Sequence, residues 1–158
     1  LREIPISQLG EDKQEEMSKN LERYSLYEAY EVRQVLETKA MDLIVRNATD
    51  SDLDEVETAY QTMLLRFAET NTTTGEFELH QLYAKKTGSV FMEQTLNIVL
   101  STILEMMHTT SHNVMDMHQV EEEKADHRRI IDALHKRDSS AAQQAMYDHI
   151  QHTLDILQ

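Results

Sequence analysis

The chain contains no cysteine, one proline and three glycines in 158 residues. Without cysteine it can form neither disulfides nor thiolate metal sites, and it has no thiol nucleophile. So few turn-forming residues predict few connections between long elements, which favours an all-helical chain. The length fits one domain that can bury a sizeable hydrophobic core.

Basic residues are also scarce. The chain has 15 lysines and arginines against 29 acidic residues, which gives a net charge of −14. This charge repels phosphate backbones and anionic lipids, so we do not expect the chain itself to bind DNA. Long apolar runs are missing too. The longest, "LNIVLSTILEMM" at 96–107, is too short to span a membrane, and no charged start leads into an apolar run as in a signal peptide.

Apolar residues recur at three- and four-residue steps along most of the chain, a spacing typical of amphipathic helices. In the second long segment, Leu53, Val56, Tyr60 and Met63 follow it. Since each segment has one apolar stripe, we expect an all-α, antiparallel bundle of six or seven helices. The predicted helices cover residues 11–24, 26–47, 76–86, 89–115, 117–136 and 140–157, and one more begins after capping by Thr49, Asp50 or Ser51 and runs to about residue 70.

Two kinds of local signal divide the chain. Residues 1–23 hold the only proline and predict a leader or linker with a short helix, followed by one helical domain over 24–158. Capping residues mark several helix starts within that domain. The capping-box spacing joins Thr73 to Glu76 and Ser140 to Gln143.

His127 lies eleven residues before Asp138, and His149 lies eleven residues after it. If the chain turns back at Asp138, antiparallel helices bring the two imidazoles level, because each residue adds the same rise. Steps of three, four and seven from each histidine reach the apolar stripe, so both point inward. A buried imidazole needs a hydrogen-bond partner or a metal. The pattern is consistent with two interpretations. Either each histidine has its own hydrogen-bond partner in the core, or both belong to one metal site.

Glu76 and His80 stand four apart, on one face of a helix. A carboxylate and an imidazole at this spacing can bind one cation together. With His127 and His149 they give three imidazoles and one carboxylate, which suit Zn²⁺, Ni²⁺ or Mn²⁺ and leave positions open for water or a ligand. The other interpretation of Glu76 is that it only completes a capping box with Thr73.

The remaining histidines give weaker signals. His108 and His112 are also four apart, near Glu105, but they fall close to a helix end, so we interpret them as exposed. No convincing partner is evident for His118, His135 and His152.

Five segments resemble, in this order, the ligand-binding domain of GntR-type bacterial transcription regulators. They are "YEVRQVLETKAMDLI", "ATDSDLDEV", "FELHQLYAKKTG", "DHRRIIDALHKRD" and "AMYDHI". The relevant branch has the FadR-like C-terminal domain, or FCD, and the resemblance covers about residues 24–157. The family's acyl-CoA-binding branch lacks the histidine set, so these histidines argue against that branch.

The resemblance implies one divalent transition metal per chain. In metal-binding members, an aspartate and a histidine four apart join one histidine from each of the last two helices. His80, His127 and His149 fall on the histidine positions, and Glu76 falls on the aspartate position. The glutamate departs from the pattern by one methylene, so the two interpretations are ligation with a shifted geometry and a capping role in which water replaces it as ligand.

The function implied is that of a cytoplasmic sensor that forms homodimers and binds a small organic acid at the metal. Arg33 stands at a position similar to an arginine that lines the effector cavity; the other interpretation is a surface ion pair with Glu37. We expect DNA binding only through a separate winged-helix domain, which this chain lacks. The alternatives are a metal-dependent hydrolase or oxygenase and a purely structural dimerisation bundle. Because no general acid or base is evident beside the set, we expect no enzyme and no catalytic residue.

Overall fold

A computed structural model of the protein describes residues 26–73, 75–110 and 117–157. Throughout these ranges every regular element is helical, which confirms the all-α prediction. The predicted leader with its short helix lies outside the described residues. The helices are α2 (Leu26–Asn47), α3 (Asp50–Thr70), α4 (Glu76–Lys86), α5 (Val90–Thr110), α6 (Met117–His135) and α7 (Ser139–Ile156).

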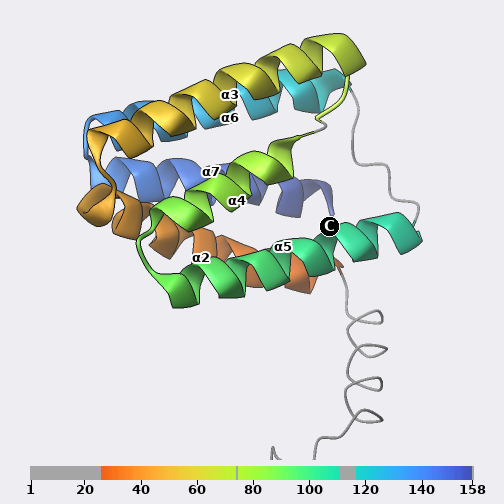
Figure 1. Ribbon diagram of the computed structural model, residues 1–158. Helices are drawn as coiled ribbons and strands as arrows, with labels where there is room; N and C mark the ends of the chain where they lie inside the picture. Colours follow the sequence, from red (N-terminus) through yellow and green to blue (C-terminus); the bar gives the residue numbers. More distant parts are fainter. Residues whose placement is uncertain (1–25, 74, 111–116, 158) are drawn as a thin grey trace, which may run out of the picture.

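The helices form two layers (Figure 1). In one layer α3, α4 and α5 lie side by side, and in the other α6, α7 and α2 do. The layers meet where α3 packs on α6 and α5 packs on α2. The short helix α4 crosses the middle of the bundle and also contacts α2. Side chains from α2, α4, α6 and α7 can therefore meet in the interior.

The turn between α2 and α3 is fixed by capping. Thr49 is the N-cap of α3, and its side chain accepts a hydrogen bond from the Asp52 amide at 3.0 Å. The Asp52 carboxylate accepts one in return from the Thr49 amide at 2.9 Å. Arg137, between α6 and α7, donates to the carbonyls of Val45 and Ala48 at 3.2 and 2.6 Å. These last contacts join the two turns at one end of the bundle.

The helix α4 begins where predicted, but its capping differs from the prediction. Gly75 is the N-cap, with φ at 95°, and its cap has no side-chain hydrogen bond. Glu76 is therefore the first residue of the helix, whereas a capping box with Thr73 would need it to be the third. That predicted box is wrong, and the Glu76 carboxylate turns into the bundle instead.

The helix α7 begins one residue earlier than predicted, at Ser139. Asp138 is its N-cap, and the Asp138 carboxylate accepts a hydrogen bond from the Ala141 amide at 3.0 Å. Gln143 donates to the Ser139 hydroxyl at 3.0 Å. The predicted capping box between Ser140 and Gln143 is wrong, because an aspartate already holds the cap position.

The interior is apolar except for one group of ionisable side chains and the buried polar residues Gln34, Thr73 and Thr87. Large side chains such as Met41, Ile44, Leu100 and Ile131 are buried. Burying ionisable groups is costly unless they are paired with one another or with an ion, so the ionisable group needs an explanation. Its members are Arg33, Glu37, Glu76, His80, Asp126, His127 and His149.

None of the described helices carries an apolar stretch of the length and purity needed to cross a bilayer.

Candidate metal centre

His127 on α6 and His149 on α7 lie opposite each other in the bundle. Their ring centroids are 4.6 Å apart, and both side chains are buried. The turn around Asp138 brings them level, as the equal spacing of eleven residues predicted. The inward direction of both histidines is confirmed.

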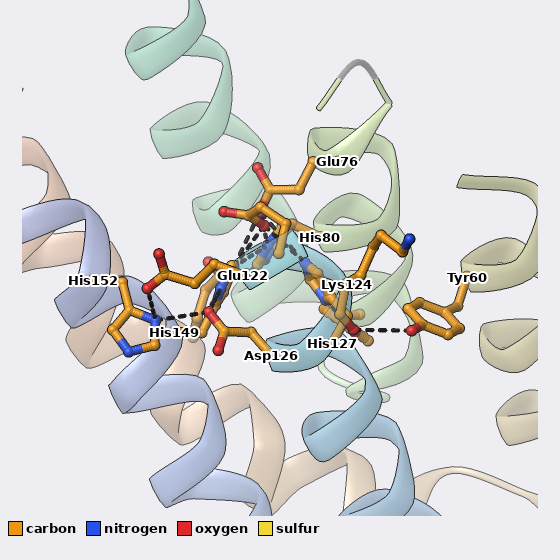
Figure 2. Close-up of polar contacts among 12 residues, drawn as sticks. Tyr60, Glu76, His80, Glu122, Lys124, Asp126, His127, His149 and His152 are labelled. Atoms are coloured by element: carbon orange, nitrogen blue, oxygen red, sulfur yellow. Dashed lines mark hydrogen bonds and ion pairs between the residues drawn. The ribbon is translucent and has the colours of Figure 1, made fainter. Parts of the chain in front are cut away.

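Glu76 and His80 reach the same point from α4. Glu76 Oε1 lies 2.6 Å from His80 Nε2, 3.0 Å from His149 Nε2 and 3.5 Å from His127 Nε2. One donor atom from each of the four residues lies within 4.8 Å of the other three, and all four residues are buried. Figure 2 shows these side chains converging from three helices. The fold thus brings together the four residues that the sequence singled out.

Each imidazole has its second ring nitrogen, Nδ1, close to an oxygen from another helix. The pairs are His80 with Glu37 at 2.5 Å, His127 with Tyr83 at 2.9 Å and His149 with Asp126 at 3.0 Å. Such a partner holds a histidine ring in one orientation, and histidines that bind metals commonly have one. In all three rings the nitrogen left facing the centre is Nε2.

The donor set fits a divalent transition ion. The buried His127 Nε2 has no hydrogen-bond partner among the described residues. Leaving a buried polar atom unpaired costs about 1–3 kcal/mol, and a bound cation would give this nitrogen a partner. Three imidazole nitrogens and one carboxylate oxygen suit Zn²⁺, Ni²⁺ or Mn²⁺.

The electrostatics of the centre favour positive charge. Burial raises the pKa of the Glu76 carboxyl, but the charge of His80 and hydrogen bonds with His80 and His149 lower it well below its usual range. For His80, burial lowers the pKa, but the charges of Glu37 and Glu76 and the hydrogen bond with Glu37 together outweigh burial and raise it. For His149, burial acts the same way, and Glu123 and Asp126 raise its pKa well above the usual value. Protons and metal ions therefore compete for the same nitrogens.

Arg33 borders the centre from α2. Its Nε donates to Glu37 Oε2 at 2.6 Å, so the ion pair exists, but the Arg33 side chain is only 2% exposed. The interpretation as a surface pair is therefore wrong. Nη2 lies 3.8 Å from Glu76 Oε1 and has no hydrogen-bond partner within the described part of the chain. The guanidinium also lies over the Tyr30 and Phe77 rings, at 5.1 and 5.0 Å. The guanidinium is therefore hydrogen-bonded through Nε, while Nη2 remains available to a ligand.

A small cavity adjoins these groups. Its volume is about 30 Å³, and Arg33, Glu76, Glu123 and His149 are among its lining residues. A buried water needs roughly 10–15 Å³ of such space, so the cavity has room for about two waters. An organic acid can enter only if lining side chains move.

The other histidines differ in part from expectation. His152 has its Nδ1 2.7 Å from Glu122 and 2.8 Å from Asp126, so the view that it lacks a partner is wrong. These three residues form a second group of side chains of the types that bind metals, nearer the surface. Their contacts with one another explain the group without a metal. His112 and the side chains of His108 and His118 lie outside what the structure describes.

Comparisons with known proteins place the fold. The FCD domain family matches residues 28–152. Streptococcus agalactiae GntR has a TM-score of 0.69 at 22% identity, over 83% of this chain and 58% of its own. E. coli McbR/YncC has a TM-score of 0.69 at 15% identity, over 95% of this chain and 70% of its own. No curated protein sequence matched.

At these identities the two structures show a shared fold, and the chain spans less than two thirds of the first one's length. The family match is broader evidence, because it covers most of the chain and includes Arg33 and the four converging residues. The chain belongs to the FCD domain family, the effector-binding domain of GntR-type regulators that its motifs resemble.

Proposed function

We propose that the chain is the ligand-sensing and dimerisation domain of a cytoplasmic GntR-type transcription regulator. It binds a small organic acid at a buried divalent metal and so controls DNA binding by a separate N-terminal domain. The observation that carries the proposal is the convergence of three Nε2 atoms and Glu76 Oε1 within 4.8 Å in a buried site.

Within this site Glu76, His80, His127 and His149 would hold the ion. When bound, a Zn²⁺, Ni²⁺ or Mn²⁺ ion supplies a positive centre with open positions for a carboxylate. The attraction is strong there because the surroundings exclude water.

Arg33 supplies a second anchor for the effector. Arg33 lines the same cavity as Glu76 and His149, and its Nη2 has no hydrogen-bond partner among the described residues. A guanidinium N–H that donates to a carboxylate or hydroxyl contributes about 1.5–3 kcal/mol. Two cationic anchors, the metal and the guanidinium, favour a dicarboxylate or hydroxy acid, which has polar groups at both ends.

The helices that carry the anchors suggest how binding is transmitted. The four predicted ligands come from α4, α6 and α7, and Arg33 comes from α2. An effector held between them would pull α2 against the other three helices. Because α2 directly follows residues 1–25, a shift of α2 would reach a domain on the N-terminal side. This coupling between two sites is what regulation of DNA binding requires.

A regulator is favoured over a hydrolase or oxygenase by the family to which the chain belongs. The sequence argument against an enzyme, that no general base stands beside the set, does not hold. Glu123 Oε2 lies 3.5 Å from His127 Nε2. We nevertheless propose that the chain is not an enzyme, and turnover assays with the loaded protein test this.

Metal analysis and calorimetry test the proposal. We expect one divalent ion per wild-type chain, its loss in His127→Ala and in His149→Ala, and its retention in His135→Ala, which alters a half-exposed histidine of α6. Metal retained in both buried variants rejects the site. A panel of mono- and dicarboxylates should bind the metal-loaded chain and not the stripped one.

The same panel tests the second anchor. Arg33→Lys keeps a positive charge beside Glu37 but loses the open Nη2, so the affinity of the best carboxylate should fall roughly tenfold. Equal affinity in wild type and Arg33→Lys would remove the anchor from the proposal.

A further inference from the structure

Glu123 is a fifth acidic or imidazole side chain at the centre, one helical turn before His127 on α6. Its Oε2 lies 3.5 Å from His127 Nε2 and 3.6 Å from His149 Nε2. That oxygen is buried and has no hydrogen-bond partner among the residues that the structure describes. The side chain as a whole is 16% exposed, whereas His127 is 0% exposed.

A buried carboxylate oxygen without a partner is costly and rare in native proteins. The two Nε2 atoms that the proposed metal would share lie 3.5 and 3.6 Å from it. A cation held by those nitrogens would satisfy the oxygen as well. Glu123 is thus placed to be a ligand and not merely a neighbour of the site.

Its position differs from that of the other four residues. Glu123 does not belong to the group whose donor atoms all lie within 4.8 Å of one another. It approaches from the side of His127 and His149, and it lines the small cavity together with Arg33. This is the side on which an effector would reach the ion.

We propose that Glu123 is a displaceable fifth ligand. Its carboxylate occupies a coordination position of the metal until the carboxylate of an effector replaces it. The inference rests on the proposed function and adds a competition to it. A side-chain carboxylate and an effector carboxylate are the same chemical group, so they compete for one position. The cavity of about 30 Å³ enlarges when Glu123 withdraws, and its partial exposure gives it a path outward.

The competition lowers the effector's apparent affinity, because only chains in which Glu123 has withdrawn can bind. If about one chain in ten is open, removing the carboxylate should tighten binding about tenfold. The affinity for the metal should change in the opposite direction, because one ligand is lost.

The test uses the full chain loaded with Co²⁺, whose visible absorption bands report on its ligands. Wild type, Glu123→Gln and Glu123→Ala are compared with Glu121→Gln, a control on the same helix whose carboxylate is 77% exposed and pairs with Lys124. The measurements are the Co²⁺ spectrum, the affinity for Co²⁺ by chelator competition, and the affinity for succinate by calorimetry.

We expect both Glu123 variants to keep one Co²⁺ per chain with shifted bands, to bind Co²⁺ roughly tenfold more weakly, and to bind succinate about tenfold more tightly. Glu121→Gln should match wild type in all three. If wild type binds metal and succinate while the Glu123 variants leave the bands and the succinate affinity unchanged, or weaken succinate binding, this inference is overturned and the proposed function stands. Failure of wild type to take up Co²⁺ overturns both.

Discussion

Glu37 connects a proposed metal ligand, His80, to the proposed effector anchor, Arg33. Its Oε2 accepts from Arg33 Nε, and its Oε1 lies 2.5 Å from His80 Nδ1. Burial raises the pKa of the Glu37 carboxyl, but the charges of His80 and Arg33 and the hydrogen bonds with them together outweigh burial and lower it to about 2. The carboxylate therefore stays ionised and fixes both the ring of a proposed ligand and the guanidinium of a proposed effector anchor.

Glu37→Gln should weaken metal binding about 10–100-fold, the usual effect of losing the partner that orients a metal-binding histidine. The amide keeps the shape of the side chain but no longer compensates the buried charge of Arg33. Chelator competition measures the affinity. Glu31→Gln, at an exposed position of the same helix, should leave it unchanged, and equal affinities in the two variants would count against the orienting role.

The pH dependence of metal binding follows from the histidines. Burial lowers the pKa values of His80 and His149, but neighbouring carboxylates, Glu37 and Glu123 first among them, raise them above the ordinary value of about 6.5. A proton on Nε2 blocks its lone pair, so metal binding must displace that proton. Affinity should fall as pH falls, and the fall should begin above about pH 6.5. Chelator competition across this range checks it, and a constant affinity down to about pH 6 would contradict it.

Among the helices, local capping signals predicted one start correctly and failed at others. The capping residues between 47 and 51 predicted the restart at α3, because a cap depends only on residues within one turn. The same rule failed at α4, where Thr73 and Glu76 have the right spacing but Gly75 takes the cap position. Glu76 takes no part in capping, because its carboxylate pairs with His80 and His149 instead.

The residues around the centre were harder to predict. Glu37 lies 43 residues from His80 in sequence, and Tyr83 lies 44 from His127. These pairs depend on how α2, α4 and α6 pack sideways, which the stripe of one helix does not determine. Glu123 did have a signal, because it precedes His127 by four residues, as Glu76 precedes His80.

The proposed ion clamps α4 onto the hairpin of α6 and α7, so its removal should destabilise the bundle. A ligand at a hundred times its Kd stabilises the folded state by about 2.7 kcal/mol. Chelation of the loaded chain should therefore lower the melting temperature by several degrees, as followed by circular dichroism. His149→Ala should melt at the same temperature with and without chelator, and a similar shift in that variant would place the effect elsewhere.

On the scale of the molecule, several large apolar side chains of α2 and α5 are exposed. We call the surface that they form the α2–α5 face. A hollow of about 390 Å³ lies on it, and Val32 and Ile98 in its lining are 53% and 69% exposed. Val35 and Phe91 are exposed large apolar side chains of the same two helices. Apolar patches of this kind mark association sites, and this one supports the proposal that a second copy of the chain packs there.

The chain should accordingly be a dimer that the double variant Val32→Lys/Ile98→Lys converts to a monomer, measured by sedimentation equilibrium. In a two-fold symmetric interface the same patch meets itself, so each lysine would face like charges in an apolar contact. Lysine also makes the net charge of −14 less negative, which means that greater overall repulsion cannot explain dissociation. Leu65→Lys is the matched control, because Leu65 is 66% exposed on α3, away from this face. A dimer that survives the double variant, or that Leu65→Lys also dissociates, would place the interface elsewhere.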